Sequence, residues 1–241
     1  MSGRRSQPPA GAARHAQLAL RFPLAARARF DDFVDAGNEE LVRRLKELDA
    51  GEAGFRGYLL FGPAGSGRSH LLQAACHAHA GRGAMYLPLA DRLLTPQMLD
   101  GLDALGLVAL DDVDAWLGRE EAERALLALY QGLQAAGGRL LVGSARPPAS
   151  LACRFPDLGS RLRGLAAYQV QPLGDAGRAL LLRRLAAQRG LEVGAAVLDF
   201  WLSRSPRELP ALLAELDRLD QAAMAAQRRL TVPLVKQVLG L

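Results

Sequence analysis

Residues 62–69 read Gly62-Pro63-Ala64-Gly65-Ser66-Gly67-Arg68-Ser69, which has the glycine spacing and the basic-hydroxyl ending of a phosphate-binding loop. An apolar run from Tyr58 to Phe61 predicts a strand before this loop, and a helical pattern follows from Ser69 to about Ala80. The glycines allow backbone N–H groups to point inward at phosphate oxygens, and the helix start adds partial positive charge. We therefore predict that residues 62–69 and His70 bind nucleotide phosphates, and that the Ser69 hydroxyl ligates Mg²⁺.

Position 68 departs from the usual loop pattern, because it holds Arg where Lys is the rule. The positive charge is kept, but a guanidinium is planar, larger than an ammonium, and forks its donors. Such a group can hold a terminal phosphate while disturbing the geometry that stabilises a transferring γ-phosphoryl group. The loop therefore predicts nucleotide binding more strongly than hydrolysis.

A second apolar run, Leu107 to Leu110, ends in two consecutive acids, Asp111 and Asp112. Acids at the carboxyl end of a buried strand lie beside the phosphate loop in folds of this kind. We expect Asp111 to hold Mg²⁺, directly or through water, and Asp112 to orient an attacking water molecule.

Short apolar runs alternate with helical patterns as far as Pro172, and helical patterns alone follow it. Strands are predicted at 58–61, 85–88, 107–110, 140–143 and 168–170, with helices after Asn38, which we expect to act as an N-cap, and over 120–135. Further helices are expected near 175–189, 195–203, 207–227 and 232–239. The order predicts an α/β fold, in which a parallel sheet is covered on both faces and a small all-helical domain follows.

Composition and charge exclude several classes of protein. The chain is half hydrophobic and contains no long apolar run, so a soluble, cytoplasmic protein is expected, with no membrane contact. Its two cysteines provide no disulfide framework, and the group Cys76, His77 and His79 lacks the spacing of a zinc site. Residues 1–30 contain six arginines and no acid, whereas the rest has 24 basic and 25 acidic residues. Only the tail could attract a polyanion, and a solvated tail is the simpler interpretation.

Taken together, these elements resemble the DnaA-related AAA+ proteins, and among them the shortened regulators of the Hda type. The resemblance extends from about residue 17 to the end. It is carried by segments 65–72, 155–162, 207–209, 216–220 and 226–236. It implies a three-layer AAA+ α/β domain followed by a helical lid, with ADP or ATP and Mg²⁺ as cofactors.

The resemblance also implies roles for individual residues. Arg161 matches the arginine finger that reaches the γ-phosphate on a neighbouring molecule, and Arg207 matches the lid arginine that reads the bound phosphates. Ala145, before Arg146, stands where the initiator has an acid. Its loss reduces the expectation of hydrolysis at this chain's own site still further.

An apolar island in the amino-terminal region resembles the peptide by which many proteins dock on the replication sliding clamp. Gln17, Leu18, Leu20 and Phe22 are its expected contacts, with Leu20 and Phe22 entering an apolar pocket. The expected domains are therefore a disordered basic tail (1–16), a docking peptide (17–22), the AAA+ domain (23–172) and the lid (173–241).

The expected function is that of a nucleotide-bound adapter. It would dock on the clamp and stimulate ATP hydrolysis by the initiator DnaA through Arg161, which would prevent re-initiation of replication. DNA contact would be indirect, because no room is left after the lid for the initiator's DNA-reading module. An autonomous ATPase, acting as a remodeller or helicase loader, is the main alternative, and a nucleic-acid-binding module is the third. Whether the chain forms a homodimer stays open.

Overall fold

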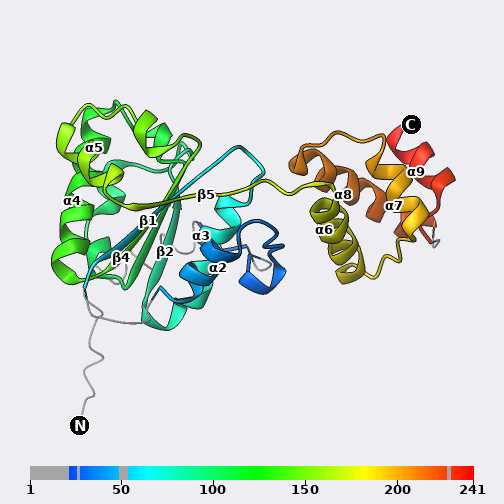
Figure 1. Ribbon diagram of the computed structural model, residues 1–241, viewed down its shortest axis with the longest axis horizontal. Coiled ribbons are helices and arrows are strands. Elements are labelled where there is room, and N and C mark those ends of the chain that lie inside the picture. Colours follow the sequence, from blue (N-terminus) through cyan, green and yellow to red (C-terminus); the bar gives the residue numbers. More distant parts are fainter. Residues whose placement is uncertain (1–21, 26–27, 49–53, 227–228) are drawn as a thin grey trace, which may run out of the picture. The chain divides into compact units, whose positions relative to one another are not determined.

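We analysed a computed structural model of the chain, which describes residues 22–25, 28–48, 54–226 and 229–241. The chain forms two compact units, shown in Figure 1. Of the described residues, the first unit contains those up to Phe33 and those within Asn38–Gln171, and the second contains Val34–Gly37 and those within Pro172–Leu241. The chain therefore enters the second unit briefly before it completes the first.

The first unit is built on a five-stranded, all-parallel sheet with strand order β2-β3-β4-β1-β5. The strands are β1 (Arg56–Phe61), β2 (Ala84–Pro88), β3 (Leu107–Asp111), β4 (Arg139–Ser144) and β5 (Ala166–Gln169). Strands β3 and β4 are buried along their whole length, which explains why they read as unbroken apolar runs rather than alternating ones.

Helices cover both faces of this sheet (Figure 1). On one face, α4 (Glu120–Ala136) and α5 (Pro156–Arg163) bury a core that includes Leu126, Leu133 and Leu158. On the other face, α2 (Glu39–Lys46) and α3 (Arg68–Ala78) bury a second core around Leu45 and Leu71. The predicted three-layer α/β fold is therefore confirmed.

Short 3-10 helices fill several connections of this unit. They are η1 (Phe30–Asp32), η2 (Ala80–Arg82), η3 (Pro96–Leu99), η4 (Leu102–Ala104), η5 (Val113–Ala115) and η6 (Pro148–Ser150). At the amino end of the sheet, the buried guanidinium of Arg139 donates hydrogen bonds to several loop carbonyls. Its donors reach Leu48 O at 3.1 Å, Gly54 O at 2.5 Å and Gly137 O at 2.7 Å.

Asn38 precedes α2 as predicted, but its side chain does not cap that helix. Its Nδ2 donates to Gln171 O at 3.0 Å, and its Oδ1 accepts from Gln171 N at 2.8 Å. The predicted capping role is therefore wrong. The amide pairs with the backbone that follows β5, because one amide group satisfies both the donor and the acceptor of that residue.

The second unit is helical and has its own core. Its helices are α6 (Asp175–Gln188), α7 (Ala195–Leu202), α8 (Leu209–Ala226) and α9 (Val232–Leu239). Leu182, Trp201 and Leu216 are fully buried in its centre. Helix α8 begins at Leu209 and not at the predicted 207, so Arg207 lies before the helix. Within the described residues, the chain offers no helix with the length and apolar character needed to cross a bilayer.

Candidate nucleotide-binding site

The carboxyl ends of three neighbouring strands bring the predicted site residues together. Strand β1 leads into the glycine loop, and Gly62 N donates to Ser144 O at the end of β4, at 3.3 Å. Strand β3 ends at Asp111, beside β4. A side chain at Gly143 would come within 2.5 Å of the Asp111 carboxylate, so a glycine is required there. The loop, the acid pair and the end of β4 therefore form one edge.

The loop has the backbone geometry of a phosphate cradle. Gly65 and Gly67 take left-handed conformations, with φ of 76° and 101°. Gly67 directly precedes α3, whose first turn has no acid and whose first N–H groups have no partner within the helix. The Ser66 hydroxyl is buried and has no hydrogen-bond partner within the described residues. An orphaned buried hydroxyl in such a loop fits a phosphate oxygen as its partner.

Arg68 lies inside the loop and is 8% exposed. Its Nη1 donates to Gly62 O at 2.8 Å, and its Nη2 reaches Asp112 Oδ1 at 3.3 Å. A lysine ammonium, which lacks the forked donors of a guanidinium, could not reach both partners in this way. The departure from the usual Lys therefore joins the loop to the second acid of β3.

Asp111 is the more buried acid and is 1% exposed. Its Oδ2 accepts from the Tyr86 hydroxyl at 2.9 Å, and its Oδ1 accepts from Asp112 N at 3.0 Å. Burial and the neighbouring Asp111 raise the pKa of Tyr86, whose hydroxyl also interacts with Gln73 and Ser69. The Tyr86 hydroxyl therefore bonds one predicted Mg²⁺ ligand, Asp111, and lies near the other, Ser69.

Asp112 takes a left-handed conformation with φ of 51°, the one non-glycine residue of the described chain to do so. Burial raises the pKa of its carboxyl, and the charges of Asp111 and Asp114 raise it further, while Arg68 opposes them. The carboxylate expected to orient a water molecule is therefore shared with a guanidinium. The contact engages one carboxylate oxygen, and the Asp112 side chain is 41% exposed, so its catalytic role stays a prediction.

Two residues of this edge escaped the sequence reasoning, Tyr86 and Asp114. Asp114 accepts from Ser144 Oγ at 3.2 Å and from Ala145 N at 2.7 Å, which anchors the end of β4. Its place two residues after the acid pair was the available signal. For Tyr86 the signal was weaker, since a tyrosine in a buried strand is usually a packing residue.

His70 faces away from the loop's cradle, towards the segment before α2. Its Nε2 lies 2.8 Å from Arg29 O, and its ring stacks on Phe33 with 5.4 Å between centroids. Burial lowers the pKa of the imidazole. Phe33 also packs on Gly67, where an added Cβ would lie 2.7 Å from the ring. The His70 side chain thus contacts Phe33, which packs on the loop, and a phosphate contact by His70 stays a prediction.

Arg207 is exposed and lines a hollow of about 450 Å³ within the helical unit, which it shares with Asp175, Arg178 and Ser205. The pKa of Asp175 is lowered by its hydrogen bond to Arg178 and then by the charges of Arg178 and Arg207. The hollow is therefore bordered by two guanidiniums, Arg178 and Arg207, and by two carboxylates, Asp175 and Asp199.

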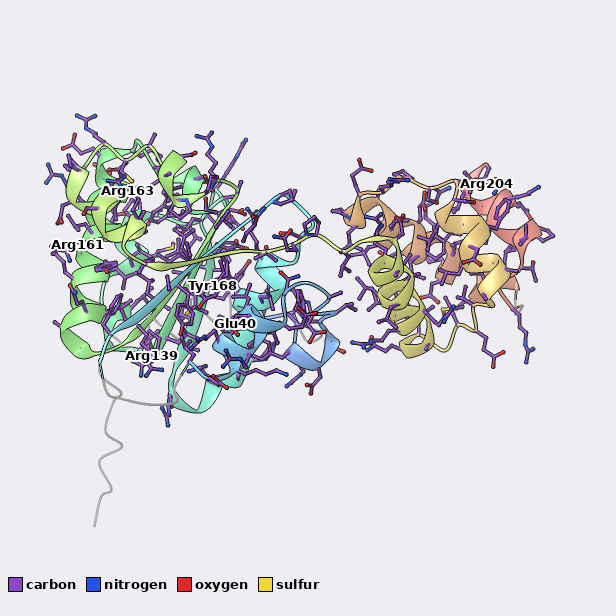
Figure 2. The ribbon with its side chains drawn as sticks, in the orientation of Figure 1. Glu40, Arg139, Arg161, Arg163, Tyr168 and Arg204 are labelled. Carbon is purple, nitrogen blue, oxygen red and sulfur yellow. The ribbon has the colours of Figure 1, made fainter. Side chains whose placement is uncertain are left out.

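Arg161 lies on α5, at the α4 side of the α/β unit (Figure 2). Its Nε donates to Asp157 Oδ1 at 3.1 Å and its Nη1 to Gln134 Oε1 at 3.1 Å. The guanidinium lies over the ring of Tyr130, 5.3 Å from its centroid. The predicted finger is thus held in one defined pose.

The docking peptide lies largely outside the described residues, since Gln17, Leu18 and Leu20 belong to the part not described. Phe22 is described, is 9% exposed, and packs in the core beneath α4. Its side chain would have to leave that core to enter a pocket on a partner. The role of Phe22 as a docking contact therefore stays a prediction, and its described position is that of a buried side chain.

Comparisons with known proteins bear on this geometry. Residues 175–239 match the family model for the lid domain of Hda. The chain is similar to domain III of the Thermotoga maritima replication initiation protein DnaA, with a TM-score of 0.78 at 20% identity, over 90% of this chain and 98% of that one.

Two further structures show how widely the fold is shared. AMPPCP-bound DnaA from Aquifex aeolicus has a TM-score of 0.67 at 20% identity, over 84% of this chain and 74% of that one. A Thermotoga maritima RuvB variant reaches 0.68 at 17% identity, over 88% and 71%. The α/β unit therefore has the fold of these AAA+ proteins, and the helical unit is similar to the lid domain of Hda.

Proposed function

We propose that this protein is a regulatory adapter that binds a nucleotide, ADP or ATP, and acts on the replication initiator DnaA. The observation that carries this proposal is the pairing of Arg68 with Gly62 and Asp112. This pairing places a guanidinium on one oxygen of the acid that would orient water for hydrolysis. The loop keeps its binding features, and the lid belongs to the Hda family. A site that holds a nucleotide and cleaves it poorly suits an adapter better than a motor.

The nucleotide's phosphates would lie on the N–H groups of the loop, with the Ser66 hydroxyl as a further donor. Ser69 and Asp111 would hold Mg²⁺, which neutralises phosphate charge when bound. Arg207 and Arg178 provide positive charge in the lid's own hollow. Nucleotide binding by a DnaA of the same fold supports this assignment.

Arg161 would act in trans, at the ATP of an initiator molecule. A guanidinium delivered to a γ-phosphate stabilises transition-state charge and contributes about 10³–10⁵ in rate where it operates. Docking on the sliding clamp through Gln17, Leu18 and Leu20 would concentrate the protein at replicating DNA, with no direct reading of DNA. The result would be an initiator converted to its ADP form, so that replication does not start again.

The proposal is tested in a reconstituted assay that contains DNA-loaded clamp, ATP-bound initiator and this protein. The Arg161→Ala variant should lose stimulation of the initiator's ATPase and still co-elute with the clamp. The Arg163→Ala variant is a matched control, because Arg163 is exposed on the same helix two residues later. Equal stimulation by the Arg161→Ala variant and the wild type would remove the finger assignment.

A second arm of the assay tests docking. Joint replacement of Gln17 and Leu20 by Ala should abolish co-elution with the clamp and leave ADP binding unchanged. Retained co-elution would contradict the docking assignment. Phe22→Ala is not a substitute for this variant, because it removes a core side chain and lowers stability.

The alternative is an autonomous ATPase, which acts as a remodeller or helicase loader. It is favoured by the fold, since RuvB shares it. A turnover above about 1 per minute by the purified protein alone would favour this function over the adapter.

A further inference from the structure

The guanidinium of Arg161 is more constrained than an exposed arginine on a short helix needs to be. Its side chain is 27% exposed and makes three different contacts: the ion pair with Asp157, the hydrogen bond to Gln134 and the approach to the Tyr130 ring. Each contact uses a different part of the group, namely Nε, Nη1 and the π-face. Together they define its direction.

Two of the three partners belong to the neighbouring helix. Tyr130 and Gln134 are four residues apart on α4, so they lie on the same face of that helix. Asp157 is four residues before Arg161 on α5 and shares its face in the same way. The guanidinium is therefore located by α4 as much as by its own helix.

The start of α5 is itself attached to α4 by a buried carboxylate. Glu123 is fully buried, and its oxygens accept from Gly118 N at 2.6 Å, Arg154 N at 2.8 Å and Phe155 N at 2.8 Å. Arg154 and Phe155 come directly before Pro156, the first residue of α5. Helix α4 therefore fixes both the beginning of α5 and the arginine near its end.

We propose that Tyr130 and Gln134 are positioning residues, which hold Arg161 in the direction in which a partner's phosphate meets it. The inference rests on the proposed function of Arg161. A guanidinium that is already oriented loses less conformational freedom when the partner arrives, and small misplacements of such a group cost rate rather than binding. Neither residue touches the reacting atoms.

Gln134→Leu is the first test, because Gln134 is exposed and its replacement leaves the core intact. Initiator ATPase is measured against increasing concentrations of the variant. We expect the plateau rate to fall about tenfold, with the half-saturating concentration and the melting temperature unchanged. A merely structural role would move the melting temperature or the half-saturating concentration instead.

Tyr130→Leu and Tyr130→Phe form a matched pair. Leucine removes the π-face and should lower the plateau, whereas phenylalanine keeps the ring and should restore it. An unchanged or raised plateau for Gln134→Leu and Tyr130→Leu, while Arg161→Ala abolishes stimulation, would overturn the positioning role alone. Full stimulation by Arg161→Ala would instead overturn the proposed function beneath it.

Discussion

The guanidinium of Arg68 and the carboxylate of Asp112 approach to 3.3 Å, yet the pKa of Asp112 is raised from its usual 3.8. Burial and two neighbouring acids outweigh the single cation. Asp112 is also in a left-handed conformation, which Asn tolerates and Ala does not. Asp112→Asn is therefore the variant that changes charge without adding backbone strain.

The sign of its effect on stability follows from the direction of the pKa shift. A carboxyl whose pKa is raised on folding contributes stability below its unfolded pKa, and this contribution is lost as pH rises through the folded pKa. We expect Asp112→Asn to have a higher melting temperature than the wild type at pH 7. The difference should shrink as pH falls and vanish near pH 3.8. Thermal melts between pH 4 and 8 check this, and a lower melting temperature at pH 7 would show that the Arg68 ion pair dominates.

Among the elements, Asn38 links the start of α2 to the end of β5 through two hydrogen bonds to Gln171. Its side chain is buried, so its removal leaves a backbone N–H and a carbonyl without partners. We expect Asn38→Ala to lower the free energy of unfolding by about 1–3 kcal/mol. Urea unfolding followed by circular dichroism measures this loss.

Asn38→Ser separates this link from a capping role. Serine caps helices as well as asparagine does, so a simple cap would make Asn38→Ser nearly neutral. The shorter hydroxyl cannot bond both groups of Gln171 in the manner of the amide. We expect Asn38→Ser to cost about as much as Asn38→Ala, and a neutral result would restore the capping interpretation.

Some elements are predictable from the sequence to within a few residues, whereas the partners of single side chains such as Asn38 are not. Strands β1 to β4 were predicted to within two residues at each end, because buried parallel strands are continuous apolar runs. Strand β5 was predicted at 168–170 and lies at Ala166–Gln169, since it is an edge strand whose residues are mostly exposed and the apolar signal of Val170 lies just beyond it. Asn38 matched a capping pattern locally, but its partner lies 133 residues away in the sequence.

The candidate site divides in the same way. The loop and the acid pair were readable because each is a compact motif next to a strand. Two contacts depend on sheet order, which the motifs do not encode: that of Arg68 with Asp112, and that of the Tyr86 hydroxyl with Asp111. The burial of Phe22 was not predictable for a related reason, because apolar spacing does not reveal which surface covers a side chain.

For the molecule as a whole, the two units have separate cores, and each core contains one of the two tryptophans. Trp116 is 1% exposed in the α/β unit and Trp201 is 0% exposed in the lid. Trp116→Phe leaves fluorescence from the lid alone, and Trp201→Phe leaves it from the α/β unit alone. Trp201 also donates to Glu215 at 2.6 Å, so shifts should be compared within each variant.

These two variants test whether one nucleotide engages both units. Saturating ADP should raise the Trp116 unfolding midpoint, because a ligand at 100 times its Kd stabilises the folded form by about 2.7 kcal/mol. If Arg207 reads the same phosphates, the Trp201 midpoint should rise as well. Arg207→Ala should then abolish the Trp201 shift and keep most of the Trp116 shift. If ADP leaves the Trp201 unfolding midpoint unchanged in the Trp116→Phe variant, whose lid is wild type, then the nucleotide binds the α/β unit alone. The lid's hollow would then serve another anion.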